Sequence, residues 1–509
     1  MNGAVSAGSP RTVEAGLFAL EQGGNAVDAA IAATLMAGVA EPLLTGLGGA
    51  GMATIRMDGL VETCDLFANT PGLADPTGPD SPMDKVTIDF GPTTQSFLVG
   101  YGAAAVPGVP AGLCAMHERH GSVPLSVLVQ PAAKAAREGV EVLPGFERVA
   151  ELLWPILARS AAVRDALGRN GQPLKAGDVY TAPDLADTLE AFGEAGADYF
   201  RDGLGAQAIC SFLQGRSRVT LADMRAQTAT FRPAIPLQYR DATVWVPGPP
   251  SAAGYAVLHV LQTLEARELE SDPIGPASVA AIREAMARID GFRTPEFFAQ
   301  MFAEDFTQRI QTALRSGAGI PSIGPGLTTH ISTVDSAGGA VSITHSLGET
   351  CGEVVEGTGI LVNNFLGEGD VNPPDLERAP GSRLVTMCCP TIIERGQDVY
   401  ALGSGGSSRI PTAVLHGAVY LVDHDMPAAQ AVASPRTHLE GGQLHVEADG
   451  RSPTTMAALT TAWPELIQFD GPNMFFGGLH MAGVARGSFT GAGDHRRSGA
   501  YGTTLGNST

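Results

Sequence analysis

The sequence predicts an α+β fold in which helices and strands occupy separate stretches of the chain. Helical patterns dominate between residues 125 and 317, whereas short strand-like runs dominate after residue 328. Many strands following many helices favour α+β layers over a doubly wound sheet, in which helices and strands would alternate. With 509 residues, the chain is long enough for two or more domains of usual size or for one large multilayer domain.

The composition is that of a globular protein, with 44% hydrophobic and 17% charged residues and no apolar run of transmembrane length. Acidic residues outnumber basic ones by 53 to 32, and no Lys/Arg cluster appears, so nucleic acid is not an expected partner. The six cysteines lack metal-ligand spacing and indicate buried thiols in a reducing compartment. Because the N-terminus carries no secretion signal, we expect a cytoplasmic protein without a membrane partner.

The N-terminal region is predicted to contain helices between residues 11 and 39. The segment from Ala26 to Met36 is small and apolar almost all round, which suits a helix buried between layers, and Asn25 is its predicted N-cap. The glycine-dense segment 41–51 follows, and it matches neither a Walker A loop nor a dinucleotide fingerprint, so no cofactor is indicated. Strands are expected at 52–57 and 61–67, joined by an Asp58-Gly59 turn.

Further along, the sequence predicts a helix ending near His120, a strand at 242–246 and a helix from 252 to about 267. A Gly/Pro-rich segment, 317–325, then leads into two alternating runs joined by a turn with two glycines. The pair Thr328-Thr329 therefore lies where a loop becomes the edge of a sheet. After it we expect strands at 391–394 and 399–402, a helix at about 410–422, and short strands to the end.

Two features of this second half invite a chemical interpretation. His330 and His345 lie on adjacent expected strands, but no metal-ligand or triad motif accompanies them, so no metal site is predicted. The segment from Gly403 to Arg409 is rich in glycine and serine, follows a strand and precedes a helix. Three interpretations are open. Its N–H groups could stabilise an oxyanion, they could bind a phosphate, or the segment is a plain tight turn.

Read together, these segments resemble the γ-glutamyltranspeptidase family of N-terminal-nucleophile (Ntn) hydrolases. The resemblance runs in order along nearly the whole chain. It is carried by segments 23–30, 41–49, 106–108, 131–139, 249–251, 328–330, 359–364, 390–392, 403–409 and 493–499.

The resemblance implies a four-layer αββα sandwich made as one precursor that cuts itself between Leu327 and Thr328. The products would be a large subunit, 1–327, and a small subunit, 328–509, which together form one fold. Thr328 would then be the nucleophile, and its new α-amine the base, because a threonine hydroxyl needs a base within hydrogen-bond reach. By the same resemblance the Ser346 hydroxyl supports the nucleophile, and the N–H groups of Gly406 and Ser407 form the oxyanion hole.

The acyl pocket departs from the family pattern. Phe67 stands where the family has an arginine that binds the α-carboxylate of a γ-glutamyl group, and Val385 and Thr386 match two assisting hydroxyls. Phe365 and Glu368 match the pair that holds the α-amine. Charge-assisted hydrogen bonds contribute about 1.5–3 kcal/mol each, so the loss of two or three would weaken γ-glutamyl binding by several powers of ten.

The sequence therefore predicts a self-processing, Thr-dependent acyl hydrolase or transferase acting on a non-standard small-molecule amide or acyl substrate in a biosynthetic or catabolic pathway. One alternative is a genuine γ-glutamyltransferase or glutathione hydrolase in which Arg383 or Arg378 binds the carboxylate. Another is a C–C bond hydrolase of antibiotic biosynthesis, as in some homologues of the family. The last is an uncleaved scaffold without activity.

Overall fold

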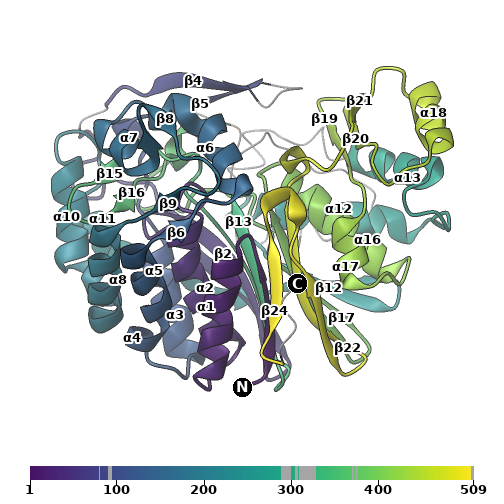
Figure 1. The fold of residues 1–509 in the computed structure, drawn as a ribbon, viewed down its shortest axis with the longest axis horizontal. Helices are drawn as coiled ribbons and strands as arrows, with labels where there is room; N and C mark the ends of the chain where they lie inside the picture. Colours follow the sequence, from purple (N-terminus) through teal and green to yellow (C-terminus); the bar gives the residue numbers. More distant parts are fainter. Residues whose placement is uncertain are drawn as a thin grey trace.

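Two antiparallel sheets form the centre of the molecule, and both take strands from before and after residue 328 (Figure 1). The computed structural model describes residues 1–78, 81–89, 94–287, 300–303, 306, 308, 328–369, 372 and 376–505. The seven-stranded sheet runs in the order β10 (Thr230–Pro233), β3 (Leu60–Leu66), β2 (Ala50–Met57), β14 (Ala340–Ser346), β13 (Thr329–Asp335), β1 (Gly3–Ala7) and β24 (Ala500–Thr503). The six-stranded sheet runs in the order β11 (Ile235–Tyr239), β12 (Ala242–Val246), β17 (Thr391–Arg395), β18 (Asp398–Gly405), β22 (Gly478–Ala485) and β23 (Ser488–Ala492).

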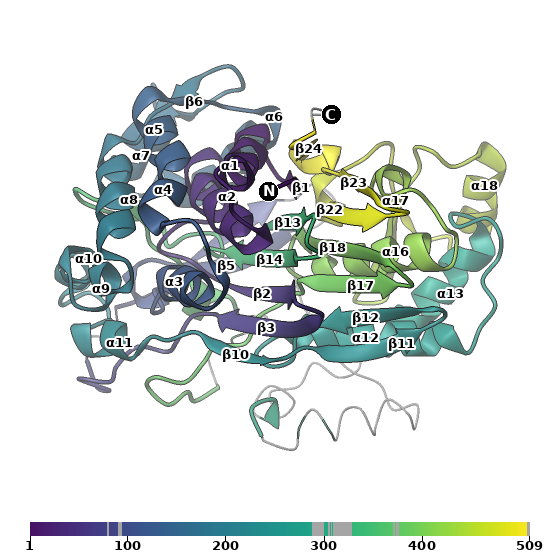
Figure 2. The same ribbon diagram turned by 90° about the horizontal axis from the view of Figure 1, so that it is seen from below.

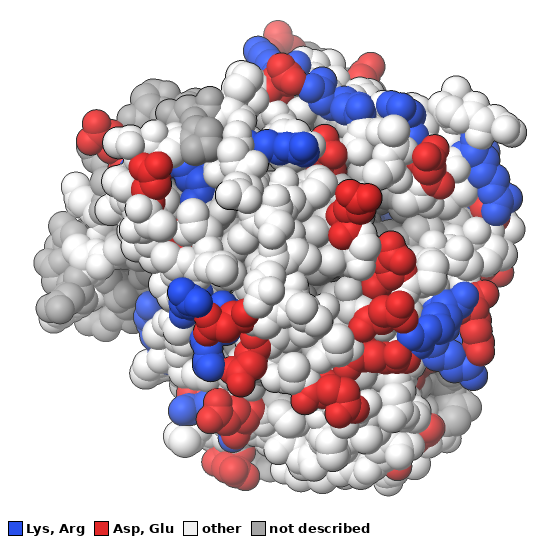
Figure 3. All heavy atoms as spheres, turned by 90° about the vertical axis from the view of Figure 1, so that its left-hand side faces the viewer, with Lys and Arg blue, Asp and Glu red and all other residues white. Residues whose placement is uncertain are grey.

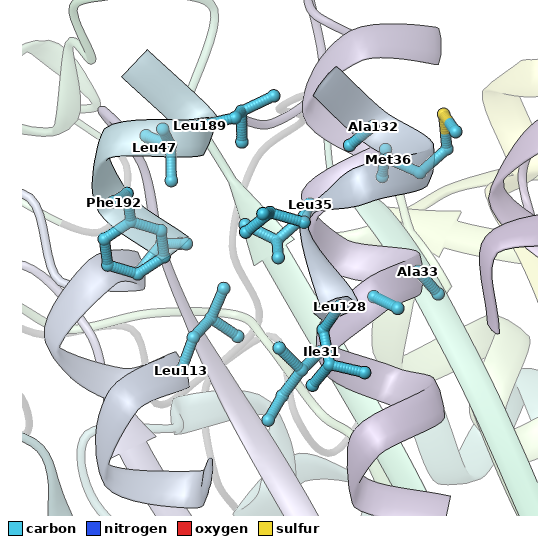
Figure 4. Close-up of a cluster of buried hydrophobic side chains, with 14 of the residues drawn as sticks. Ile31, Ala33, Leu35, Met36, Leu47, Leu113, Leu128, Ala132, Leu189 and Phe192 are labelled. Carbon is cyan, nitrogen blue, oxygen red and sulfur yellow. The ribbon is translucent and has the colours of Figure 1, made fainter. Parts of the chain in front are cut away.

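The outer face of the seven-stranded sheet is covered by helices, of which α2 (Ala26–Ala40) is the most buried. Asn25 caps this helix by accepting hydrogen bonds from the N–H groups of Val27 and Asp28, as the sequence predicts. Because α2 contacts β13 and β14 on one side and helices on the other, apolar side chains are needed all round it. Figure 4 shows Ile31 and Leu35 of α2 packed among Leu113, Leu128 and Phe192 from the surrounding helices.

The other helices of this side surround α2 and the sheet edge (Figure 2). They are α1 (Pro10–Glu21), α3 (Val109–His120), α4 (Leu125–Leu128), α5 (Gln130–Glu138), α6 (Pro144–Leu157), α7 (Ala161–Leu167), α8 (Pro183–Ala195), α9 (Ala197–Arg201), α10 (Leu204–Leu213) and α11 (Leu221–Ala226).

The six-stranded sheet has helices of its own. Helix α16 (Arg409–Val422) packs against β18 and against α12 (Ala252–Glu265). Further helices on this side are α13 (Pro276–Ala287), α17 (Ala428–Ala433) and α18 (Pro453–Ala462). The inner faces of the two sheets meet, with β13 in contact with β18 and β22 (Figure 1). The mixed helix-and-sheet organisation predicted from the sequence is therefore correct.

Several elements were not expected from the sequence. The short strand β1 consists of small residues. It pairs with β13 and β24, which come from the later part of the chain. The two-stranded ribbon β4 (Asp84–Asp89) and β5 (Thr94–Val99) also went unpredicted. Smaller strands are β6 (Val140–Glu141), β7 (Gly168–Arg169), β8 (Gln172–Pro173), β9 (Val179–Tyr180), β15 (Val354–Val355), β16 (Ile360–Leu361), β19 (Thr437–Glu440), β20 (Gln443–Glu447) and β21 (Ile467–Phe469). Short 3-10 turns are η1 (Tyr101–Ala103), η3 (Phe365–Gly367), η4 (Met474–Phe476) and η5 (His495–Arg497).

The charged side chains of the helical face lie interspersed, with acidic and basic groups side by side (Figure 3). Arg137 of α5, for example, pairs with Asp187 and Glu190 of α8. Over the described ranges, none of the helices combines the length and the apolar character that crossing a membrane requires.

Candidate active site

Thr328 lies directly before β13. Side chains along that strand alternate between the two faces of the sheet, so the strand's orientation determines which face the Thr328 side chain occupies. The Ser332 hydroxyl donates to the His480 carbonyl of β22 at 3.2 Å, so even-numbered residues of β13 face the six-stranded sheet. The Thr333 hydroxyl donates to the Ala26 carbonyl of α2 at 2.7 Å, so odd-numbered residues face the helices. Since successive side chains of a strand alternate, the Thr328 side chain belongs on the face between the sheets.

The main chain of Thr328 is enclosed from the opposite sheet. Arg497 Nη1 donates a hydrogen bond to the Thr328 carbonyl oxygen at 3.0 Å. A Cβ atom on Gly405, the last residue of β18, would lie only 1.8 Å from the same oxygen. Position 405 therefore requires glycine, and the end of β18 is brought directly against the predicted nucleophile.

The predicted oxyanion-hole residues follow immediately after Gly405. Gly406 has φ 119° and Ser407 has φ 45°, and their carbonyl oxygens accept hydrogen bonds from the first N–H groups of α16. Left-handed backbone costs a residue with a side chain about 1–2 kcal/mol, so Ser407 is strained where glycine would not be. The turn thus begins one residue after the contact with Thr328 and leads directly into helix α16.

A row of residues crosses the edge of the seven-stranded sheet. In the strand register Thr329 pairs with His345, Ser346 with Ala50, and Gly51 with Leu66. Extending the first and third pairings by one residue places Thr328 opposite Ser346 and Phe67 opposite Ala50. The four residues therefore lie side by side at one edge and on one face of the sheet. At about 4.8 Å per strand, Phe67 lies roughly 14 Å from Thr328.

Ser346 occupies the position next to Thr328 in this row. Its Oγ accepts a hydrogen bond from the Gly348 N–H at 2.8 Å. A Cβ atom on Gly348 would lie 2.8 Å from Oε1 of the half-buried Glu368, so this carboxylate also lies beside the row.

Phe67 and Phe365 meet at the far end of the row. Their ring centroids are 5.0 Å apart, and both side chains are 1% exposed. They form one apolar cluster with Ala50, Met52, Ala68, Ala105, Leu384 and Cys388. Both rings are expected from the sequence to lie in the acyl pocket, and the fold brings them together.

Arg383, considered above as a substitute clamp, is already bound to other protein groups. Its Nε pairs with Asp65 at 3.1 Å, and its two remaining nitrogens donate to the carbonyl oxygens of Phe67 and Thr228. Arg378 donates to the Leu376 carbonyl at 3.3 Å.

Val385 and Thr386 lie between Leu384 and Cys388, two members of the apolar cluster around Phe67 and Phe365. The Val385 side chain packs in the core of the six-stranded sheet, and the Thr386 Oγ accepts a hydrogen bond from the Cys388 N–H at 3.1 Å. The other half of the predicted cleavage site, Leu327, lies outside the described residues.

Two groups that contact Thr328 or its neighbour were not assigned roles from the sequence. The Thr329 hydroxyl donates to Glu41 Oε2 at 2.6 Å, and burial raises the pKa of that carboxyl above its ordinary value. Arg497 is the other, and burial lowers its pKa to about 10, so its guanidinium stays protonated at neutral pH. The sequence does carry signals for these two residues. Glu41 is a charged residue at the end of an apolar helix, Arg497 is one of two adjacent arginines in a glycine-rich segment, and both lie in segments that carry the family resemblance.

Buried ion pairs support the segment that carries Arg497. Asp494 pairs with Arg436 at 2.5 Å and with Arg496 at 3.2 Å, and Arg496 pairs with Glu447 at 2.6 Å. Although burial alone opposes ionisation, the two arginines hold the pKa of Asp494 below its usual range. Because unpaired buried charges are strongly destabilising, this network fixes the η5 segment in one position.

The two histidines of the β13–β14 pair are hydrogen-bonded by hydroxyl groups. His330 contacts Thr344 and Ser332, and His345 contacts Thr45. Burial lowers the pKa of His330 well below its usual value and that of His345 to about 3, so both are neutral. Among the described residues, no group of three or more His, Cys, Asp or Glu side chains is arranged to hold a metal ion.

Comparison with known proteins identifies the family. The family model described as gamma-glutamyltranspeptidase matches residues 12–504. The chain is 29% identical over 467 residues to the acylase ACY 1 proenzyme of Pseudomonas sp. (strain SE83), a match that covers 87% of this chain and 84% of the relative. It is 30% identical over 514 residues to the glutathione hydrolase proenzyme of Escherichia coli (strain K12), covering 90% and 84%.

The fold is also found among solved structures. The cephalosporin acylase from Bacillus halodurans superposes with a TM-score of 0.81 at 22% identity, covering 98% of this chain and 95% of that one. The fold, the family model and the curated relatives agree with one another. This chain belongs to the gamma-glutamyltranspeptidase family and is an Ntn-hydrolase enzyme of acyl transfer and hydrolysis.

Proposed function

We propose that this protein is a self-processing acyl hydrolase or transferase that uses Thr328 and binds an acyl group other than γ-glutamyl. The observation that carries the proposal is the contact between Phe67 and Phe365, at 5.0 Å between centroids, on the same sheet edge as Thr328. Two buried rings offer no hydrogen bonds to a carboxylate or an ammonium group. They suit an apolar, uncharged part of an acyl donor.

The processing step follows from the chemistry of a threonine beside a peptide bond. The Thr328 hydroxyl attacks the Leu327 carbonyl carbon, the C–N bond breaks, and the hydroxyl proton passes to the leaving nitrogen. Water then hydrolyses the resulting ester, giving a carboxylate on Leu327 and a free α-amine on Thr328. The proenzyme names of the curated relatives support such a step.

In turnover the free amine, with an ordinary pKa of about 7.7–8.0, removes the hydroxyl proton as Thr328 attacks the acyl donor. The N–H groups of Gly406 and Ser407 would stabilise the oxyanion, and the Ser346 hydroxyl would support the nucleophile. The position of Gly405 against the Thr328 carbonyl supports the oxyanion role of the residues that follow it. The register of Ser346 with Thr328 supports the role of the Ser346 hydroxyl.

We also propose that the pieces 1–327 and 328–509 stay together as subunits of one αββα sandwich. Support comes from the strands that both pieces give to each sheet, and from the outer helices α2 and α16 on opposite sheets. If the two pieces folded as separate domains, each sheet would lack some of its strands.

The test compares acyl donors on the processed protein. A chromogenic γ-glutamyl anilide and an anilide with an uncharged apolar acyl group of similar length are assayed for kcat/KM. We expect the apolar donor to be preferred by at least about tenfold, since each lost charge-assisted hydrogen bond is worth about 1.5–3 kcal/mol. Equal or higher kcat/KM for the γ-glutamyl donor contradicts the altered pocket.

A genuine γ-glutamyl enzyme is the second candidate, because several curated relatives are named glutathione hydrolase. The binding of Arg383 to Asp65 and to two carbonyl oxygens argues against its use as the carboxylate clamp. Preference for the γ-glutamyl donor in the same assay would favour this candidate.

A further inference from the structure

One carboxyl group joins the first strand residue after Thr328 to two helices. Glu41, at the C-terminal end of α2, accepts a hydrogen bond from the Thr329 hydroxyl at 2.6 Å and another from the Thr12 hydroxyl of α1 at 3.0 Å. Thr12 and Thr329 are at most 2% exposed, and Glu41 is 7% exposed. A Cβ atom on Gly8 would lie 2.2 Å from Glu41 Oε2, so the carboxyl is closely covered.

The strand register shows why this contact matters to the nucleophile. Pairing of β13 with β1 ends at Ile331, opposite Ala7, whereas pairing with β14 continues to Thr329, opposite His345. The first residues of β13 therefore have a strand partner on one side only. Where the β1 pairing is missing, the side chain of Thr329 is bound to Glu41 on the helical face of the sheet.

Thr328 is thus fixed from two directions. Arg497 holds its carbonyl oxygen from the side of the six-stranded sheet, and Glu41 holds the next side chain from the side of the helices. Since Thr328 and Thr329 share a peptide unit, a shift of Thr329 turns the backbone from which the Thr328 hydroxyl and α-amine project. Misplacement of reacting groups by about 1 Å costs about 100-fold in rate.

We propose that Glu41 is a positioning residue for Thr328 and acts through the Thr329 hydroxyl. The inference rests on the proposed role of Thr328 as nucleophile. Glu41 itself forms no bond with the substrate in this account. It keeps the end of β13 in the orientation that both processing and turnover need.

The chain offers a matched pair of variants for the test, because Thr12 and Thr329 bind the same carboxyl group. Thr329→Val and Thr12→Val each remove one hydroxyl and conserve side-chain shape. Both should lower the melting temperature by similar amounts. Only Thr329→Val should slow processing and lower kcat, by about 10- to 100-fold, with KM little changed. Equal effects of both variants on kcat would overturn the inference and leave Glu41 as a packing residue.

A second pair of variants tests Glu41 directly. Glu41→Gln keeps an acceptor oxygen and adds an amide that donates to a hydroxyl, so kcat and processing should be largely retained. Glu41→Ala leaves two buried hydroxyls unpaired and should reproduce the kcat loss of Thr329→Val. If Glu41→Ala folds and processes at the wild-type rate, the inference is wrong.

Thr328→Ala separates this inference from the proposed function. If that variant still splits before residue 328, the nucleophile assignment itself fails. If it is inert while Thr329→Val and Thr12→Val behave alike, only the role of Glu41 fails.

Discussion

Arg497 Nη1 donates a hydrogen bond to the carbonyl oxygen of Thr328 at 3.0 Å, joining residues 169 positions apart in the chain. The guanidinium is buried and is held by a segment that the Asp494, Arg436 and Arg496 ion pairs fix in place. A charged donor on the carbonyl of the proposed nucleophile restricts the backbone of that residue more than a neutral donor, because charge-assisted hydrogen bonds are about twice as strong. The C-terminal segment thus helps to orient the residue at the proposed cleavage site.

The first prediction concerns this contact. Arg497→Met removes the donor and the charge while filling similar space, and we expect processing to slow by about 10- to 100-fold. A gel time course of the freshly purified precursor measures the rate. Arg486→Met is the control, because Arg486 is an exposed arginine with an ion pair to Asp425. Equal processing of both variants would show that the contact is dispensable.

The second prediction is that Thr328→Ala abolishes both cleavage and turnover, because the hydroxyl serves both reactions. Intact mass spectrometry should find one chain of about 52.4 kDa after long incubation. Thr460→Ala, which alters an exposed hydroxyl bound within its own helix, should process normally. A wild-type chain that also stays whole would favour the inactive scaffold.

The third prediction uses the strained turn at Ser407, where φ is 45°. Ser407→Gly removes strain of about 1–2 kcal/mol, less about 0.4–1 kcal/mol for the added freedom of the unfolded chain. We therefore expect roughly 0.5–1 kcal/mol of added stability in chemical denaturation, with kcat retained, because the N–H group is unchanged. A large loss of kcat would mean that the serine hydroxyl, not the main chain, takes part in the reaction.

The fourth prediction tests Phe67 as a determinant of acyl preference. Phe67→Leu should cost about 1–2 kcal/mol of stability through lost ring contacts and imperfect repacking, and should change the ratio of kcat/KM values between a short and a bulky apolar donor. Phe192→Leu is the control, since Phe192 is equally buried but lies in the helical cluster around α2. The control should lose similar stability and keep the same ratio. If the ratio does not move in Phe67→Leu, the ring does not border the acyl group.

The fifth prediction concerns stability against pH. Burial lowers the pKa of His345 and His416 to about 3 and that of His480 to about 4, against an ordinary 6.5. Between pH 4 and 6.5 the unfolded chain therefore binds more protons than the folded protein, so stability falls as pH falls through this window. Each such histidine contributes a slope of about 1.4 kcal/mol per pH unit.

Urea unfolding at several pH values measures this slope. His416→Gln should reduce the slope of the unfolding free energy against pH by about 1.4 kcal/mol per pH unit, because glutamine does not titrate. An unchanged slope would mean that His416 is not kept neutral by burial.

Much of the local structure could be predicted from the sequence because it depends on neighbours along the chain. The Asn25 cap and the apolar surface of α2 follow from residues within a few positions of one another. The same holds for the β2–β3 hairpin around Asp58-Gly59 and for the turn between β18 and α16. The strand β1 could not be predicted, because five small residues acquire their pairing from segments more than 300 positions away.

By itself the sequence determined the family and the segments that carry the proposed chemistry, because motif residues at Thr328, Gly406 and Ser407 keep a fixed order along the chain. It also predicts that the acyl pocket departs from the family at Phe67. Only the tertiary structure decided what surrounds these residues. The contacts of Glu41 with Thr329 and of Arg497 with Thr328 span 288 and 169 positions, and they exist because the register of β13 and the packing of two sheets bring the groups together.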